Sequence, residues 1–411
     1  MESERIVGGR RPPTVVIGPL ADYAAGFRQF LIAQGYARRT ITVQVSLMAH
    51  LSRWLQAEGL TVDALRSSAD IDRFFAERRA RGHSSAVSAN ALAALLGFLR
   101  DRQVIGRPAA DAGTPARRLL ADYRRYLREE RGSAAATVRG FSACAAMFLR
   151  VLPAERLEEA LAAISAADVT RFVAGWAASR SPAYSKSMVS ALRSVLRFLH
   201  SCGYIPRPLA SAVPAVPGWR VAGRPRAVTG REVTAILAAC DRGSARGRRD
   251  YAILMLLTRL GLRAGEVAGI GLSDIDWRQG LLMVRGKGNS LDGLPVPVDV
   301  GEAVAGYIRH GRPRCQSRVL FVSVRAPFAG LSAASVGSAV RRACEAAGLD
   351  GFGPHRLRHA VACQLLREGA SLNEIGQLLR QRDPRTTARY AIVDAGALAG
   401  LARPWPQGAG R

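Results

Sequence analysis

Lysine is almost absent from this sequence of 411 residues. Lys186 and Lys287 are its two lysines, and arginine supplies the rest of the 59 basic side chains. A coding bias toward Arg, Ala and Gly explains most of this imbalance. It also draws attention to the two lysines, because an ammonium group has chemistry that a guanidinium lacks.

Paired cysteines and long apolar runs are missing as well. The six cysteines are scattered without a Cys-x-x-Cys pair, which argues against a disulfide framework or a zinc site. The first residues lack the apolar core of a signal peptide, and the longest apolar run, residues 251–258, is too short to span a bilayer. We therefore expect a soluble, cytoplasmic protein with reduced thiols and no membrane partner.

Acidic residues are scarce, with 32 against 59 basic ones and a net charge of +27. Such an excess of one sign repels itself in a compact protein, so it predicts a polyanionic partner. Nucleic acid is the first candidate. A membrane surface is the second, but it predicts a basic amphipathic helix or a polybasic tail, whereas these arginines are spread along the whole chain.

The N-terminal half repeats itself at an offset of about 100 residues. The repeated strings are Ala-Asp-Tyr at 21–23 and 121–123, Phe-Leu at 98–99 and 198–199, and an Asp-x-x-Arg-Phe pattern at 70–74 and 168–172. The apolar residues have helical spacing: a first helix lies around Phe27 or Tyr123, and a second begins at Thr40 or Thr137. This pattern predicts two copies of a small four-helix domain.

The rest of the chain changes in character after a linker rich in proline, glycine and arginine. Thr229 and Glu232 form a capping box that starts a helix, a second helix covers about 249–259, and 281–285 and 294–298 are predicted strands. From Ser332 onward the pattern is helical. We predict a mainly α protein with two tandem helical domains and a mixed α/β catalytic domain that carries a small antiparallel sheet. The predicted segments are 1–17 (N-terminus), 18–106 and 115–210 (helical domains), 211–226 (linker), 227–395 (catalytic domain) and 396–411 (tail).

The string Thr-Arg-Leu-Gly-Leu-Arg-Ala-Gly-Glu at 258–266 places Arg263 at a turn between two helices. Gly261 and Gly265 would let the backbone bend tightly there. Glu266 is close enough to orient the guanidinium through a charge-assisted bond. An ordinary surface Arg-Glu pair is the competing interpretation, and it contributes little to stability.

Lys287 lies at the tip of the predicted hairpin, in Arg285-Gly-Lys-Gly. A mobile ammonium can donate a proton to a leaving oxygen, which arginine does not. A phosphate-binding P-loop does not fit, because the glycine spacing is wrong and Gly288 replaces the required Ser or Thr. A plain solvated turn explains this segment equally well.

His355 and Arg358 are predicted to share one face of a helix that begins at Pro354. A neutral imidazole can take a proton while the neighbouring guanidinium holds a phosphate. His355 and His359 also have the spacing of a zinc pair. That interpretation is weak, because Arg356 stands where a zincin motif has Glu and no further ligands follow.

Tyr390 follows a turn at Asp383-Pro384 and a Thr-Thr pair, after a basic cluster. A single tyrosine among nine is usually a core or surface residue. The motifs that precede it in order are what make Tyr390 a candidate nucleophile.

Together these motifs resemble the tyrosine recombinase, or phage integrase, family. The resemblance covers about 226–395, and the repeated N-terminal region resembles the helical core-binding domain of that family in two copies. The strings at 379–382 and 390–394 look closer to recombinases of transposons and other mobile elements than to phage prototypes.

The resemblance implies DNA transesterification without metal, ATP or another cofactor. Arg263 and Arg358 would clamp the scissile phosphate, and Glu266 would support the pocket. His355 would act as general base, Lys287 would protonate the 5′-oxygen, and Tyr390 would form a 3′-phosphotyrosyl bond. The implied partners are double-stranded DNA and three further copies of the chain, with the tail after Tyr390 packed on a neighbour. The arginines expected to contact DNA are Arg220, Arg224, Arg226, Arg285, Arg380, Arg382 and Arg385.

Gln381 departs from the family pattern, which usually has His or Trp nine residues before the tyrosine. An amide can donate a hydrogen bond to a phosphate oxygen, but it carries no charge and shuttles no proton. A tolerated replacement in a secondary role is the favoured interpretation. The alternative is a weak or silent subunit that acts beside a partner recombinase.

Overall fold

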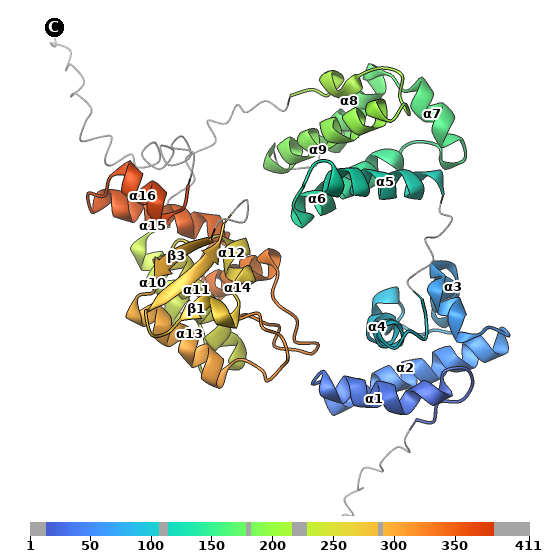
Figure 1. Ribbon diagram of the computed structural model, residues 1–411, viewed down its shortest axis with the longest axis horizontal. Helices are drawn as coiled ribbons and strands as arrows, with labels where there is room; N and C mark the ends of the chain where they lie inside the picture. The colour runs from blue at the N-terminus through green and yellow to red at the C-terminus, as the bar shows by residue number, and fades with distance from the viewer. Residues whose placement is uncertain (1–13, 107–113, 178–181, 216–227, 287–290, 382–411) are drawn as a thin grey trace, which may run out of the picture. The chain divides into compact units, whose positions relative to one another are not determined.

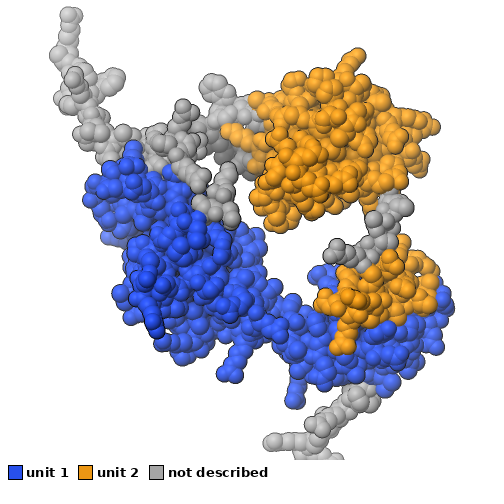
Figure 2. Space-filling view, in the orientation of Figure 1, with its two compact units in different colours: residues 1–59, 90–98, 222–411 blue, residues 60–89, 99–221 orange. Residues whose placement is uncertain are grey.

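The structure, a computed structural model, describes residues 14–106, 114–177, 182–215, 228–286 and 291–381 (Figure 1). These residues fall into two compact units, one of residues 1–59, 90–98 and 222–411 and one of residues 60–89 and 99–221 (Figure 2). The boundary between the units runs through the first predicted helical domain. The predicted domain limits therefore stay predictions.

The elements that the structure describes in the N-terminal half are all helices (Figure 1). Its first part holds η1 (Ala21–Tyr23), α1 (Ala24–Ala33), α2 (Arg38–Ala57), η2 (Val62–Arg66), α3 (Ser68–Ala80), η3 (Ala89–Leu92) and α4 (Ala93–Asp101). Its second part holds α5 (Pro115–Glu129), α6 (Ala135–Leu149), η4 (Ala154–Arg156), α7 (Leu157–Ala163), α8 (Ala166–Ala177), α9 (Pro182–Ser201) and η5 (Leu209–Ala212). The second part thus has one α-helix more than the predicted four.

Three aromatic rings meet in the same way in each part: Phe27, Phe30 and Phe98 in the first, Tyr123, Tyr126 and Phe198 in the second. The ring centroids are 6.4, 5.5 and 5.4 Å apart in the first trio and 6.3, 5.1 and 5.2 Å apart in the second. Asp70 pairs with Arg73 at 3.1 Å, as Asp168 pairs with Arg171 at 2.8 Å. Shared internal geometry of this kind supports a duplicated domain.

The Ala-Asp-Tyr match does not belong to that duplication. Residues 21–23 form a 3-10 turn before α1, whereas residues 121–123 lie within α5. The ring trios pair Tyr123 with Phe27 rather than with Tyr23, so this identity in sequence is fortuitous. Thr40 and Thr137 also differ from the prediction, because α2 begins at Arg38 and α6 at Ala135. Both threonines lie in the first turn and not at the cap.

The C-terminal part combines helices with a small sheet (Figure 1). Its elements are α10 (Gly230–Ala238), α11 (Ala245–Arg259), α12 (Ala264–Gly269), η6 (Leu272–Asp274), β1 (Ile275–Asp276), β2 (Leu281–Arg285), β3 (Leu291–Pro295), α13 (Val298–His310), α14 (Ala333–Ala346), α15 (Pro354–Arg367) and α16 (Leu372–Leu378). The sheet is antiparallel in the order β1-β2-β3. Helix α11 packs against α13, α14 and α15, and its apolar residues between Ala252 and Leu257 form the centre of the core.

Two predicted elements of this part are shifted. β3 begins at Leu291, and Val298, predicted as strand, is the first residue of α13. Pairing sets this register, since Arg285 lies opposite Leu291 and Leu281 opposite Pro295. Helix α11 starts at Ala245 rather than Arg249, because Ser244 caps it by accepting a hydrogen bond from the Gly247 N–H. The predicted capping box of Thr229 and Glu232 is present with both of its bonds.

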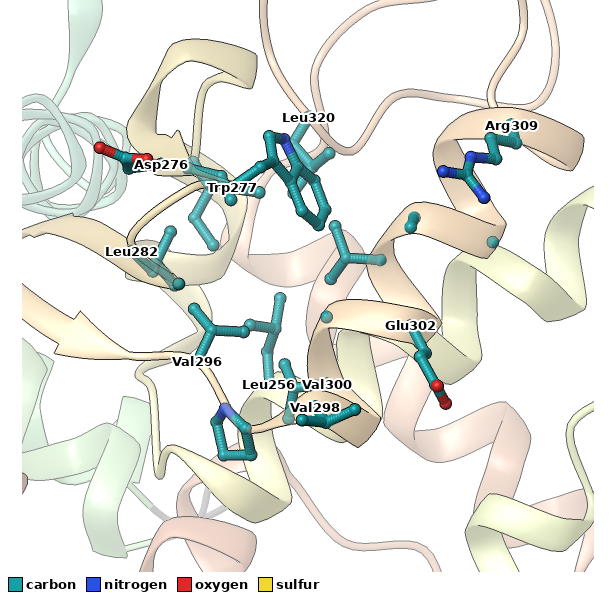
Figure 3. Close-up of a pocket in the computed structure, with 18 of the residues that line it drawn as sticks. Leu256, Asp276, Trp277, Leu282, Val296, Val298, Val300, Glu302, Arg309 and Leu320 are labelled. Carbon is teal, nitrogen blue, oxygen red and sulfur yellow. The ribbon is translucent and has the colours of Figure 1, made fainter.

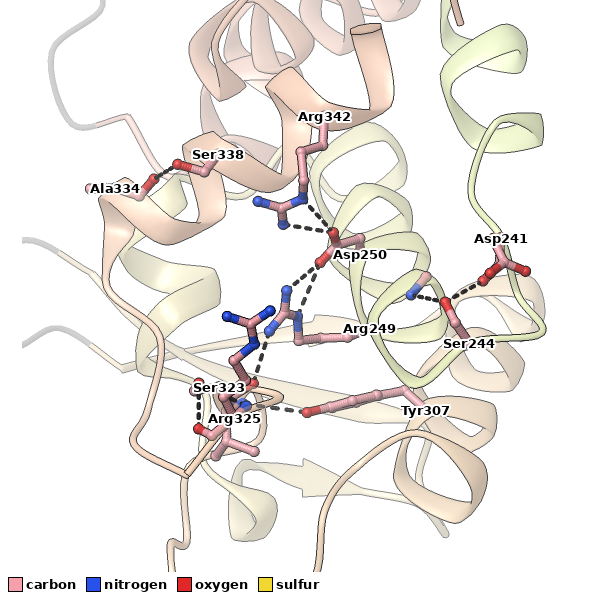
Figure 4. Close-up of polar contacts among 12 residues, drawn as sticks. Asp241, Ser244, Arg249, Asp250, Tyr307, Ser323, Arg325, Ala334, Ser338 and Arg342 are labelled. Carbon is pink, nitrogen blue, oxygen red and sulfur yellow. Dashed lines mark hydrogen bonds and ion pairs between the residues drawn. The ribbon is translucent and has the colours of Figure 1, made fainter. Parts of the chain in front are cut away.

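A buried charge cluster joins α11 to α14 (Figure 4). Asp250 Oδ1 accepts bonds from Arg249 Nε and Nη2 at 3.0 and 2.8 Å, and its Oδ2 accepts from Arg342 Nε and Nη2 at 3.2 and 2.7 Å. Arg249 Nη1 also donates to the Val322 carbonyl at 3.1 Å. The cluster therefore fixes the segment around Val322 against the helical core.

Among the described residues, no single helix is both long and apolar enough to cross a membrane. The helical stretches 135–149 and 154–163 pass such a test only as a pair, with a bend of 100° between them.

Candidate active site

Arg263 caps the N-terminus of α12, in an extended conformation with φ of −76° and ψ of 149°. Its backbone N–H donates to Glu266 Oε2 at 2.8 Å, and its Nη1 donates to Glu266 Oε1 at 2.5 Å. The predicted charge-assisted bond is therefore present. Burial alone would raise the pKa of Glu266, but the backbone N–H of Arg263 and the charges of Arg380 and Arg263 outweigh it and lower the pKa. Glu266 is thus held as a carboxylate that orients Arg263.

Gly261 makes the turn between α11 and α12 through a φ of 58°. A Cβ at this position would lie 2.6 Å from Leu379 Cδ2, so the turn needs glycine for space as well as for its dihedral angle. Gly265 differs from the prediction: it lies in the first turn of α12, without a positive φ and with open space where a Cβ would be. Gly261 alone of the two makes the bend.

Arg358 lies on α15 and is buried among these turns, with 2% of its surface exposed. Its Nη1 donates to the Gly261 carbonyl at 2.6 Å, and its Nη2 donates to the Leu379 carbonyl. Arg263 Nη2 donates to the next carbonyl, that of Arg380, at 3.4 Å. The two guanidinium groups therefore bind the carbonyls of adjacent residues, about 3.8 Å apart along the backbone, at the end of α16.

His355 is the second residue of the same helix, exposed and one turn before Arg358. Partial burial of the ring, and then the positive charges of Arg358 and Arg263, lower the pKa of His355 below its ordinary value. Its Nε2 lies 3.0 Å from the Nε2 of His359, with the two rings nearly perpendicular at 88°. The neutral imidazole, which can accept a proton, is therefore the favoured form.

Arg380 and Gln381 follow the end of α16. Arg380 has a left-handed φ of 52°, and its Nη2 donates to Glu266 Oε2 at 2.7 Å. The Gln381 N–H donates to the Gly376 carbonyl at 2.8 Å, which continues the turn. The structure thus places Arg380 inside the domain beside Glu266, an arrangement that does not support the predicted DNA contact.

Arg285, also predicted to contact DNA, lies at the end of β2. Its Nη1 and Nη2 donate to the two carboxylate oxygens of Asp274 at 3.0 and 3.1 Å. More than half of its side chain is exposed. The sequence did not suggest this partner, because Asp274 lies in the short 3-10 helix η6, 11 positions before Arg285.

The remaining predicted site residues lie outside the described residues. These are Lys287, Tyr390 and the arginines Arg220, Arg224, Arg226, Arg382 and Arg385. Their roles stay predictions. The described part of the site consists of Arg263, Glu266, His355, Arg358 and Gln381.

A cavity of about 440 Å³ lies elsewhere in this part, between the sheet and α13 (Figure 3). Leu256, Trp277, Leu282, Val296 and Val300 are among its mainly apolar lining, and no predicted catalytic residue lines it. Within the ranges that the structure describes, no group of three or more His, Cys, Asp or Glu side chains could hold a metal ion.

Comparison with known proteins matches two stretches of the chain. Residues 226–396 match the phage integrase family, and residues 120–203 match the N-terminal SAM-like domain of phage integrases. The protein y4rA of Sinorhizobium fredii (strain NBRC 101917 / NGR234), provisionally named an integrase/recombinase, is 37% identical over 401 residues, 96% of each chain. The chain belongs to the phage integrase family.

The tyrosine recombinase XerD of Mycobacterium tuberculosis is a further relative, 30% identical over 68% of this chain and 94% of that one. The chain of 411 residues is accordingly a tyrosine recombinase, an enzyme of site-specific DNA recombination.

Two solved structures show that the fold is shared. XerH bound to its palindromic difH substrate has a TM-score of 0.54 at 16% identity, over 82% of this chain and 94% of that one. A lambda integrase (75–356) dimer bound to a COC′ core site has a TM-score of 0.51 at 21% identity, over 68% and 95%.

Proposed function

We propose that this recombinase cuts and rejoins specific DNA sites of a mobile element through a 3′-phosphotyrosyl bond to Tyr390. One observation carries the proposal: Arg263 and Arg358, from segments far apart in sequence, bind consecutive carbonyls at the end of α16. The chain that continues from this point leads to Tyr390 within nine residues of Gln381. Two guanidinium groups near a neutral imidazole suit the transition state of a phosphodiester transesterification.

The guanidinium pair would hold the scissile phosphate. A phosphate oxygen is a charged acceptor and forms a stronger hydrogen bond than a neutral carbonyl, so it can replace the carbonyl partners that the arginines have in the free chain. Donors fixed in advance by Glu266 and by the protein backbone stabilise the additional charge of the pentavalent transition state.

Proton movements complete the reaction. The Tyr390 hydroxyl gives its proton to His355, its oxygen attacks phosphorus, and the bond from phosphorus to the 5′-oxygen breaks. Lys287 gives a proton to that leaving oxygen. Rejoining runs the same steps backward with a 5′-hydroxyl as attacking group, so the phosphotyrosyl bond keeps the energy of the broken phosphodiester.

Double-stranded DNA and further copies of the chain are the proposed partners. The net charge of +27 supports binding to the phosphate backbone. Exchange of both strands between two DNA sites breaks four strands, so it needs four active sites and hence a tetramer. A DNA substrate of this kind also places the protein in the cytoplasm, at the nucleoid.

A suicide substrate tests the proposal. DNA that carries the element's own recombination site, nicked just beyond the cut, loses a short fragment on cleavage and traps the covalent adduct. We expect the adduct with wild type and none with Tyr390→Phe. If wild type forms no adduct, even with a partner recombinase supplied, the proposal fails.

Gln381 supports a second candidate, a subunit that binds DNA and relies on a partner for cleavage. An amide replaces a group that usually carries a proton or an indole N–H at this place. The same assay separates the candidates, since this one predicts an adduct on the partner alone.

A further inference from the structure

Arg380 stands where the backbone favours glycine. It follows Leu379, the C-cap of α16, and has a left-handed φ of 52°. Glycine is the usual residue at such a helix end, and an L residue is disfavoured in this conformation because its Cβ lies too close to the following carbonyl oxygen. Local conformation gives no reason for an arginine here, so the reason has to lie in the contacts of its side chain.

Those contacts are internal. Arg380 Nη2 lies 2.7 Å from Glu266 Oε2, and its Nη1 donates to the Leu378 carbonyl at 3.1 Å. Its side chain is 6% exposed, close to the 5% of Glu266. An ion pair buried to this extent fixes the end of α16 against the start of α12.

Glu266 is therefore shared between two arginines. Its Oε1 accepts from Arg263 Nη1, and its Oε2 accepts from the Arg263 backbone N–H and from Arg380 Nη2. A guanidinium beside a carboxylate tends to form two parallel bonds with both oxygens. Arg380 occupies one acceptor position of Glu266 Oε2. Arg263 makes one side-chain bond to Glu266, and its Nη2 donates instead to the Arg380 carbonyl at the end of α16.

We propose that Arg380 is a positioning residue: by holding Glu266 Oε2, it keeps the Arg263 guanidinium beside Arg358 and His355. The inference rests on the proposed function, in which Arg263 binds the scissile phosphate. Without the Arg380 guanidinium, Arg263 and Glu266 close into a two-bond pair, and Arg263 turns away from the phosphate.

Two variants and one control test this role. Arg380→Gly removes the side chain and suits the left-handed backbone, and Arg380→Lys keeps the charge but not the fork of donors. Arg341→Ala removes an exposed arginine of α14 whose Nη2 donates to Ser338 Oγ at 2.8 Å, and serves as control for lost charge. The first readout is the rate of adduct formation on the nicked substrate at saturating protein.

We expect Arg380→Gly to form the adduct about 10- to 100-fold more slowly, the range for residues that orient the direct ligands of a site. Arg380→Lys should lie between Arg380→Gly and wild type, and Arg341→Ala should match wild type. DNA affinity should keep its dependence on salt in Arg380→Gly, because loss of a direct phosphate contact would lower the slope by about 1.

A second readout does not need catalysis. NMR titration of the His355 ring reports the position of Arg263, whose charge helps to lower the pKa of His355, whereas Arg380 is not among the causes of that shift. His359 Nε2 lies 3.0 Å from His355 Nε2, and burial and the charges of Arg358 and Arg263 lower the pKa of His355. If Arg263 withdraws, the pKa of His355 rises in Arg380→Gly and stays unchanged in Arg341→Ala.

The outcomes separate this inference from the proposed function. If wild type forms no adduct, the proposed function is wrong. The His355 titration still decides the role of Arg380 in that case. An unshifted His355 or a wild-type rate in Arg380→Gly overturns the inference, and so does a smaller salt slope, which would make Arg380 a DNA contact. If Arg380→Gly does not fold, the same two readouts on Arg380→Lys decide, with wild-type values in both as the contrary result.

Discussion

Two carboxylates of the C-terminal part, Asp250 and Glu266, each lie between two arginines. In each cluster one arginine side chain is buried, Arg249 at 7% and Arg380 at 6% exposure, and the other is partly exposed, Arg342 at 39% and Arg263 at 41%. Composition and burial therefore do not tell the clusters apart.

The hydrogen bonds of the Asp250 and Glu266 clusters do differ. Arg249 and Arg342 each give two side-chain N–H groups to Asp250, and Arg249 gives a third to the Val322 carbonyl. Arg263 gives one side-chain N–H to Glu266 and a longer bond to the Arg380 carbonyl. The first cluster uses its donors to hold the fold, whereas in the second cluster Arg263 has one side-chain bond to Glu266 and one to a backbone carbonyl. Under the proposed function, a binding site for phosphate thus differs from a structural tie in how its donors are used.

The largest expected effect is on the rate of adduct formation, and it should distinguish Arg263 from Arg342, the two partly exposed arginines. Arg263→Ala should slow adduct formation about 100- to 1000-fold, as loss of one preorganised donor does, with little change in thermal midpoint. Arg342→Ala should lower the thermal midpoint and keep the wild-type rate. Equal losses of rate in both variants would show that the clusters do not differ as described.

Loss of the first carboxylate should lower stability. Asp250→Asn leaves the buried Arg249 without an opposite charge, and we expect the free energy of unfolding to fall by about 3 kcal/mol. Asp122→Asn is the matched control, because its pair with Arg125 at 2.7 Å is exposed and should contribute less than about 1 kcal/mol. Urea denaturation measures both, and similar values for the two variants would contradict the structural role of Asp250.

The rate of adduct formation should depend on pH, because His355 lies beside the second cluster. The neutral imidazole accepts the proton, and a lowered pKa keeps it neutral to lower pH. The rate of adduct formation should therefore decline at low pH with a midpoint below 6.5, the ordinary value for histidine. His355→Gln should lose this inflection. A midpoint at or above 6.5 in wild type would contradict the assignment.

The smallest effect concerns Gln381, next to Arg380. In a secondary role, Gln381→His should change the rate of adduct formation by less than about tenfold, well below the 10²- to 10⁴-fold of a positioned proton donor or acceptor. A larger gain would indicate that Gln381 limits the natural enzyme and would favour the partner-dependent alternative.

Features that depend on a few neighbouring residues could be predicted from the sequence. The capping box at Thr229, the start of α15 at Pro354 and the bond from Arg263 to Glu266 all join residues within one helical turn. The same holds for the order of the motifs, which was enough to indicate the family.

Features that depend on distant residues could not be predicted. Asp250 and Arg342 are 92 positions apart, and Glu266 and Arg380 are 114 apart. Arg249 and Asp250 alone look like an exposed pair, and Arg380 looks like one more arginine of a basic cluster. The register of β3 follows from its pairing with β2, which the short strand does not determine by itself.

The most direct test of the central claim is to map the protein residue that carries DNA. The adduct trapped on a nicked substrate, digested with nuclease and protease, gives a peptide whose added nucleotide can be located by tandem mass spectrometry. We predict the nucleotide on Tyr390, attached through its 3′-phosphate. A nucleotide on another residue, or one attached through a 5′-phosphate, would contradict this account.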